Sequence, residues 1–163
     1  RNALEHLPAL PPGTYLSLNV TPFTVLDPQF ADSLSAYPLG RLVLEITEHA
    51  CVDDYEKIAR ALAPLRRKGA RLAVDDAGAG YASFRHILKL KPDIIKLDRS
   101  LIQHIDTSDD HRTLATALVQ FSRSVGSQVL AEGVETPEEL AALRNLGIKL
   151  AQGYLLGRPQ ALH

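Results

Sequence analysis

The sequence predicts an α/β domain built on a parallel sheet, because short apolar runs alternate with helical patterns along the chain. Six runs rich in leucine and β-branched residues have the length of strands; they lie at residues 15–20, 41–46, 71–74, 93–97, 127–131 and 148–152. Strands separated by helices are typical of βα units. Six strands in 163 residues fit either an open doubly wound sheet or a closed (β/α) barrel.

Three helices are predicted from apolar spacing and from the residues that begin and end helices. Residues 53–68 and residues 112–125 each place apolar side chains at helical intervals, and each stretch is followed by a glycine. Pro137 opens the third helix in its first turn, where a missing N–H donor has no effect. Thr136 and Glu139 have the spacing of a capping box at the start of this helix.

Composition and charge indicate a soluble globular protein with no basic surface. A net charge of −1 argues against binding to a nucleic acid polymer or to anionic lipid. No apolar run approaches the roughly 18 residues of a membrane span, so any membrane anchor would belong to another part of a parent protein. The single cysteine, Cys51, excludes an internal disulfide, and a cytoplasmic location is expected. Because the chain lacks methionine and begins at Arg1, we expect a fragment of a longer protein.

Polar residues recur at the same place on the predicted strands. Side chains alternate in direction along a strand, so one face of each run is uniformly apolar. The other face ends in one polar residue per strand: Asn19, Glu45, Asp75, Lys96, Glu132 and Gln152. A buried parallel strand should be continuously hydrophobic. In a (β/α) barrel the carboxyl edge of the sheet carries the active site, so these six residues are candidate site residues.

The oxygen-rich character of this set predicts a site for hard divalent cations. Carboxylate and amide oxygens without a His or Cys cluster suit Mg²⁺ or Mn²⁺ better than zinc. Asn19, Glu45 and Asp75 are predicted to hold one ion, and Asp76 to reach toward a second. Two such ions can clamp the attacking and leaving oxygens of a phosphoryl group.

Lys96 and Glu132 complete the predicted chemistry. Lys96 would stabilise developing charge or hold the attacking water, and Glu132 would accept the proton of that water. Structural roles stay open, because Asp75 and Asp76 would also cap the turn that follows them and Lys96 would also extend from the barrel rim to solvent. The six histidines show no ligand spacing, and Cys51 has no base nearby in the sequence, so surface or packing roles are expected for them.

Six segments resemble, in order, the signatures of the EAL domain family: LSLNVTP (16–22), LEITE (44–48), LAVDDAGAGYASF (72–84), IIKLDRSLI (94–102), LAEGVET (130–136) and AQGYLLGRP (151–159). The resemblance implies a (β/α)8 TIM-like barrel that hydrolyses the bacterial second messenger cyclic di-GMP to linear pGpG with Mg²⁺ or Mn²⁺. The barrel would be incomplete here, with about six βα units and its first strands missing. Residues 1–163 would form the C-terminal two-thirds of a single EAL-type domain.

The resemblance also implies a role for each site residue. It assigns metal ligation to Asn19, Glu45, Asp75 and Asp76. It places Lys96 and Asp98 around the catalytic water, with Glu132 as the general base. It implies substrate contacts from Gln152, Glu135 and Asn19. Glu48 would brace the loop at residues 77–83, which in the family helps to order the metals and a dimer interface.

Two departures from the family pattern bear on activity. The Glu-Ala-Leu motif that names the family, with a glutamate that ligates metal, is absent from this chain, so the chain alone is expected to be inactive. Ala77 and Ala79 replace the usual Phe and Thr of the loop after Asp76. The alternative function is a catalytically inactive domain that binds cyclic di-GMP as a receptor. Sensory or GGDEF-type domains in the parent chain and a homodimer are the expected partners.

Overall fold

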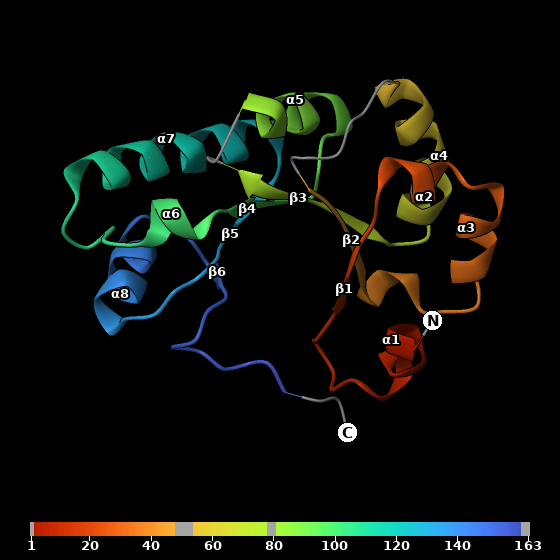
Figure 1. Ribbon diagram of the computed structural model, residues 1–163, viewed down its shortest axis with the longest axis horizontal. Helices are drawn as coiled ribbons and strands as arrows, with labels where there is room; N and C mark the ends of the chain where they lie inside the picture. Colours follow the sequence, from red (N-terminus) through yellow and green to blue (C-terminus); the bar gives the residue numbers. More distant parts are fainter. Residues whose placement is uncertain (1, 48–53, 78–80, 161–163) are drawn as a thin grey trace.

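The chain forms one curled parallel sheet with helices along its outer side (Figure 1). The structure, a computed structural model, describes residues 2–47, 54–77 and 81–160. Neighbouring strands are all parallel and follow the order β1-β2-β3-β4-β5-β6. The strands are β1 (Leu16–Asn19), β2 (Leu42–Ile46), β3 (Arg71–Ala77), β4 (Ile94–Leu97), β5 (Gln128–Ala131) and β6 (Leu150–Ala151).

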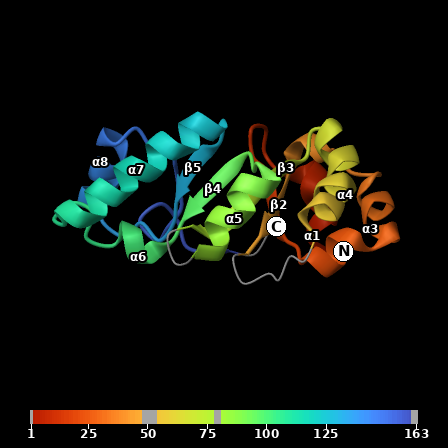
Figure 2. The ribbon, with the colours of Figure 1, turned by 90° about the horizontal axis from the view of Figure 1, so that it is seen from above.

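The strand order decides between the two folds compatible with the sequence. A doubly wound sheet reverses its order at a switch point, whereas here each strand lies beside the next one in the chain. The sheet bends around an axis with its helices outside, as the two views in Figures 1 and 2 show. The architecture is therefore part of a (β/α) barrel. All six predicted strands are present, although the sixth is shorter than predicted and the third continues to Ala77.

Helices connect the strands and cover the outer face. Among the described residues the helices are α1 (Asn2–Glu5), α2 (Pro22–Leu26), α3 (Pro28–Leu34), α4 (Tyr55–Arg67), α5 (Tyr81–Leu90), α6 (Arg99–Ile102), α7 (Asp109–Val125) and α8 (Pro137–Asn145), with short 3-10 turns at Leu7–Ala9 and Leu39–Arg41. The three predicted helices correspond to α4, α7 and α8. The structure begins α7 three residues earlier than predicted, because the Ser108 side chain accepts a hydrogen bond from the His111 N–H and caps the helix. The predicted capping box of Thr136 and Glu139 is confirmed.

The alternation of side chains along the strands is confirmed by the packing. Outward-facing residues such as Leu44 and Leu97 join two large apolar clusters with the helices. The inner face carries a smaller apolar layer formed by Val43, Ala73, Ile94 and Leu130, with Tyr15 and Leu150 packed against it. This layer lies on the inner face of the sheet, below the carboxyl ends of the strands. The polar residues that follow it along each strand are therefore left at the open end.

The two outer strands of the sheet each pair on one side only among the described residues. The side chains of β1 are half-buried or exposed, whereas every residue of β2 is buried. After β6 the chain runs back along the open side of the half-barrel toward α1 (Figures 1 and 2). None of the helices in the described ranges combines the length and apolar character that crossing a membrane requires.

Candidate active site at the carboxyl ends of the strands

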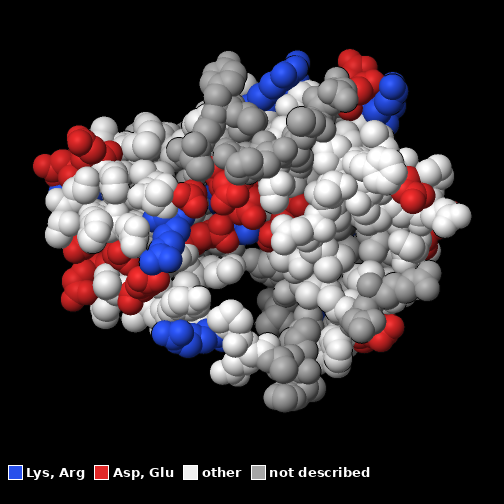
Figure 3. Space-filling model, viewed as in Figure 1, with Lys and Arg blue, Asp and Glu red and all other residues white. Residues whose placement is uncertain are grey.

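A buried lysine lies at the centre of the candidate site and contacts three carboxylates. Lys96 on β4 is 6% exposed. Its Nζ lies 3.0 Å from Glu45 Oε2 on β2 and 3.0 Å from Asp75 Oδ1 on β3. The same atom lies 2.9 Å from Oε1 of Glu132, which follows β5 directly. Acidic side chains gather at the middle of the face in Figure 3, which has the same viewpoint as Figure 1.

Strand register explains why these groups meet. Val74 on β3 and Ile95 on β4 are register partners, and Asp75 and Lys96 are the residues that directly follow them. Asn19 is the register partner of Glu45 between β1 and β2, although the Asn19 side chain is exposed. Because inner-face positions of parallel strands point into the barrel together, the carboxyl ends of four strands converge on Lys96.

The electrostatics of the cluster favour added positive charge. Burial alone would lower the pKa of Lys96, but hydrogen bonds to Glu132 and Asp75 outweigh it and raise that pKa above its ordinary value. Burial and the nearby charge of Asp75 raise the pKa of Glu132 to about 7, with Lys96 opposing the shift. One ammonium group thus faces more carboxylates than it can neutralise.

The acid residues also offer a place for a metal ion. One carboxylate oxygen from each of Asp75, Asp76 and Glu132 lies within 4.8 Å of the other two. Asp76 has a left-handed backbone with φ of 55°, which a short polar side chain tolerates better than most residues. Oxygen-only donors with excess negative charge fit a hard divalent cation. The sequence predicted Glu45, and not Glu132, as a metal ligand beside Asp75 and Asp76. In the structure Glu132 belongs to the group of three acids, and Glu45 contacts Lys96.

Asp98 has a structural contact in addition to its predicted place near the water. It is the N-cap of α6, where Oδ1 accepts a hydrogen bond from the Ser100 backbone N–H at 2.8 Å and another from the Ser100 hydroxyl. Partial burial would raise the pKa of Asp98, but the hydrogen bonds from Ser100 lower it overall. A direct contact between Asp98 and the Lys96 cluster is not among the interactions found in the described residues.

Two charged residues that the sequence did not single out for the site, Arg99 and Glu139, hold the segment that carries Glu132. Arg99 Nη2 lies 2.9 Å from Glu135 Oε1. The stem of Arg99 packs on Gly133, where a Cβ would lie 2.5 Å from Arg99 Cγ. The buried Glu139 carboxylate accepts hydrogen bonds from the backbone N–H groups of Glu135 and Thr136, at 2.9 and 3.2 Å. The capping-box spacing identified Glu139 as a helix cap, but no sequence signal marks the contact of Arg99 with Glu135.

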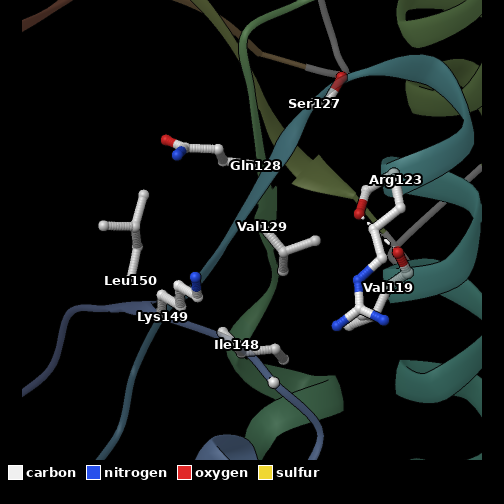
Figure 4. A pocket seen from close by; sticks show the side chains of 10 residues that line it. Val119, Arg123, Ser127, Gln128, Val129, Ile148, Lys149 and Leu150 are labelled. Carbon is white, nitrogen blue, oxygen red and sulfur yellow. Dashed lines mark hydrogen bonds between the residues drawn. The ribbon is translucent and has the colours of Figure 1, made fainter.

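The remaining predicted residues lie at the edge of the site or outside the described ranges. Gln152 follows β6 with an exposed side chain, and its backbone N–H donates to Ala131 O at 2.8 Å. Glu48 and the loop residues 78–80 lie outside the described residues. A separate cavity of about 240 Å³ lies at the amino ends of β5 and β6, lined by residues that include Arg123 and Lys149 (Figure 4). It is at the opposite end of the strands from Lys96, where a barrel usually has structural roles.

Comparison with known proteins gives a consistent picture of the chain. The EAL domain family model matches residues 1–159. The chain is 37% identical over 129 residues to a probable cyclic di-GMP phosphodiesterase, PdeD, from Escherichia coli K12, covering 78% of the chain but only 24% of PdeD. It therefore spans about a quarter of the length of this relative.

Solved structures of EAL domains have the same fold. The EAL domain of Mycobacterium smegmatis DcpA superposes with a TM-score of 0.82 at 32% identity. The match covers 89% of this chain and 68% of the solved DcpA chain. The manganese and cyclic di-GMP complex of Klebsiella pneumoniae BlrP1 has a TM-score of 0.83 at 30% identity, covering 96% of this chain and 41% of BlrP1's. A calcium complex of BlrP1 with the same nucleotide superposes equally well. Because the family model matches residues 1–159 of the 163 in this chain, the chain belongs to the EAL domain family.

Proposed function

We propose that the acid cluster around Lys96 binds divalent metal ions and hydrolyses cyclic di-GMP to linear pGpG. The observation that carries this proposal is the convergence of Glu45, Asp75 and Glu132 on one buried lysine at the carboxyl end of the sheet. The similarity to PdeD, a probable cyclic di-GMP phosphodiesterase, and the cyclic di-GMP complexes of BlrP1 support the choice of substrate. The proposal concerns the full-length protein, since the chain spans only part of its relatives.

The metal ions are proposed to be Mg²⁺ or Mn²⁺, two per site. Asn19, Glu45 and Asp75 would hold the first and Asp76 the second, with Glu132 close enough to Asp75 and Asp76 to contribute an oxygen. Bound ions would polarise the phosphoryl group and lower the pKa of a coordinated water. The oxygen-only donors of this group support a hard cation over zinc.

The side chains of the cluster have separate roles in the proposed reaction. Glu132 accepts the proton of the attacking water, because its carboxylate lies beside Asp75 and Asp76, which would hold the metal. Lys96 remains protonated because its pKa is raised, so it can stabilise negative charge that develops on the phosphoryl oxygens. Asp98 would orient the water, and Gln152, Asn19 and Glu135 would contact the nucleotide.

The comparisons support part of the proposed place of this chain in its protein. Residues 1–163 would be the C-terminal two-thirds of one EAL-type domain, in keeping with the 68% of the DcpA EAL domain that they cover. We propose that the parent chain carries further sensory or GGDEF-type domains and that the protein forms a homodimer. The proposed ligand is cyclic di-GMP, and no nucleic acid polymer is expected to bind. A cytoplasmic location stays a prediction. The inactive receptor remains the alternative, but no observation on the described acids favours it.

Metal binding is expected to weaken as the pH falls below 7. With its pKa raised to about 7, Glu132 holds a proton below that pH, and an incoming cation must displace it. Apparent Mn²⁺ affinity should therefore fall by up to about tenfold per pH unit below 7 and level off above it. Calorimetric titrations between pH 5.5 and 8.5 measure this dependence. Glu132→Gln should flatten it, and a wild-type affinity that stays constant from pH 6 to 8 would contradict the assignment.

Removal of the metal tests the proposed chemistry most simply. EDTA should stop formation of pGpG from cyclic di-GMP by the full-length protein, and excess Mn²⁺ should restore it. Chromatography of the nucleotides measures both steps. Formation of pGpG at the same rate in EDTA would refute a metal-dependent mechanism.

A further inference from the structure

The cavity at the amino ends of β5 and β6 carries positive charge and no acid. Its lining comes from α7, from the first residues of β5 and from the turn that leads into β6 (Figure 4). Arg123 and Lys149 line it, whereas no aspartate or glutamate of the described chain does so. Gln128 begins β5 at this cavity, and Glu132 directly follows the other end of the same strand. The cavity is therefore a candidate binding site separate from the acid cluster.

Neither cation of the cavity is neutralised by the protein itself. Within residues 2–47, 54–77 and 81–160, Arg123 and Lys149 have no ion pair and no side-chain hydrogen bond, and both residues are exposed. Arg66, in contrast, pairs with Asp93 at 3.2 Å. Two positive charges beside one cavity are thus left for an anionic ligand.

The end of α7 does not depend on the Arg123 side chain. A cation in the last turn of a helix can interact with the helix dipole. Here the helix ends on Gly126, whose backbone is left-handed with φ of 79° and whose N–H donates to the carbonyl oxygens of Ser122 and Arg123. The Arg123 side chain extends instead toward Gly147, where a Cβ would lie 2.7 Å from Nη2. The guanidinium group therefore lies against the turn that precedes β6.

The cavity has an apolar floor, formed by Val119, Val129 and Ile148, all of which are buried. In the view of Figure 4, Arg123 and Lys149 lie on either side of Val129 and Ile148. Sites for small molecules usually combine an apolar lining with a few charged or polar groups that fix the orientation of the ligand. This lining therefore suits an anion that carries an apolar body better than it suits a bare ion.

The two cations favour a phosphate group as the anion. A phosphate monoester carries a charge of about −1.5 to −2 at neutral pH, which two positive side chains match. The planar guanidinium of Arg123 can donate two parallel hydrogen bonds to phosphate, and Lys149 adds a point charge. The cavity volume of about 240 Å³ limits the organic part to a single ring or a short chain.

We propose that the cavity between α7, β5 and β6 binds a small organic phosphate monoester. Arg123 and Lys149 hold the phosphate, and the organic part lies on the apolar floor. The site goes beyond the proposed function, because it uses none of the acid-cluster residues and requires no metal ion.

Titration of phenyl phosphate into the full-length protein, followed by NMR of its labelled methyl groups, tests the site. EDTA is present, so that no metal ion at the acid cluster can hold phosphate. We expect a Kd on the order of 1 mM or below, with the largest shifts at the methyl groups of Val119, Val129 and Ile148. Inorganic phosphate and phenol each supply one half of this ligand, and each should bind at least about tenfold more weakly.

Substitution of the two cations tests their roles in binding. Arg123→Gln should weaken the binding of phenyl phosphate by about tenfold or more, because charge-assisted hydrogen bonds are lost. Lys149→Gln should weaken it less, by about threefold or more, since an ammonium group acts as a point charge. Arg67→Gln and Lys89→Gln are matched controls in the last turns of α4 and α5; both residues are exposed and lie outside the cavity lining, so both variants should bind like wild type.

Several results would overturn the site. These are equal binding of phenyl phosphate and phenol, unchanged binding in both Arg123→Gln and Lys149→Gln, or methyl shifts confined to other parts of the protein. Inorganic phosphate that binds as tightly as phenyl phosphate would overturn the assignment of an organic ligand. Formation of pGpG is measured separately with Mn²⁺, so failure of this site and failure of the proposed function are distinguishable.

Discussion

Glu132→Gln is expected to abolish hydrolysis of cyclic di-GMP in the full-length protein while leaving nucleotide binding nearly unchanged. A general base acts in the transition state and contributes about 10²- to 10⁴-fold to the rate, so kcat should fall by at least about 100-fold. The substitution is nearly isosteric and keeps an oxygen that can accept from Lys96, which lies 2.9 Å from Glu132 Oε1. Chromatographic assay of pGpG measures the rate, and calorimetry measures the affinity for cyclic di-GMP.

A matched variant separates this effect from a general change of charge. Glu138→Gln removes one carboxylate from the exposed first turn of α8, six residues along the chain from Glu132, and should retain wild-type turnover. If Glu132→Gln keeps more than a small fraction of wild-type kcat, Glu132 is not the base. If it loses nucleotide binding as well as turnover, Glu132 also helps to hold the nucleotide, directly or through the metal.

Asp75→Asn is expected to cause a large loss of metal affinity. Asp75 belongs to the three-acid group whose oxygens lie within 4.8 Å of one another, and it also pairs with Lys96 at 3.0 Å. Loss of a direct ligand should exceed the 10- to 100-fold effect typical of outer-shell changes, so Mn²⁺ should bind at least about 100-fold more weakly. Titration of Mn²⁺ into the wild type and the variant gives the two affinities.

The same substitution has a second expected effect that a simple loss of folding would not produce. The charge of Asp75 helps to raise the pKa of Glu132, so removing it should shift the pH dependence of the remaining metal binding to lower pH. Asp110→Asn, on the exposed first turn of α7, is the matched control and should bind Mn²⁺ like the wild type. Equal affinity in Asp75→Asn and wild type would remove Asp75 from the metal site.

The strands were predictable because each one has a regular two-residue alternation between layers. Leu44 packs against helices while Val43 and Glu45 face inward, and the same rule holds on every neighbouring strand. The order of the strands was not predictable from this pattern, since alternation is the same in an open sheet and in a barrel. Only the pairing of each strand with the next decides the barrel.

Local signals predicted some helices and missed others. The Thr136 capping box and the glycine after α7 are strong local signals. Helix α8 begins where it was expected, and α7 ends where it was expected but begins three residues earlier. The shorter helices α2, α3 and α6 depend on caps such as Asp98 and Asp27, which also suit turns, and they were not predicted. The extension of β3 to Ala77 includes an irregular register and a left-handed Asp76, neither of which follows from side-chain type.

The position of the site was predictable, and its contacts were not. Polar residues at matching strand ends predicted that Glu45, Asp75, Lys96 and Glu132 would lie together, and the structure brings these four into one cluster. The pairing of Arg99 with Glu135 depends on two segments more than 30 residues apart in sequence, so it has no local signature. The pKa of Glu132 likewise depends on burial and on the placement of Asp75.

The most direct test of the account is the identity of the nucleotide after a single turnover. Cyclic di-GMP would be incubated with an excess of the full-length protein and Mn²⁺, and the products would be resolved by chromatography. We expect complete conversion to linear pGpG by the wild type and recovery of intact cyclic di-GMP from Glu132→Gln. Cyclic di-GMP that stays bound but intact in the wild type would contradict the proposed hydrolysis and would indicate a receptor.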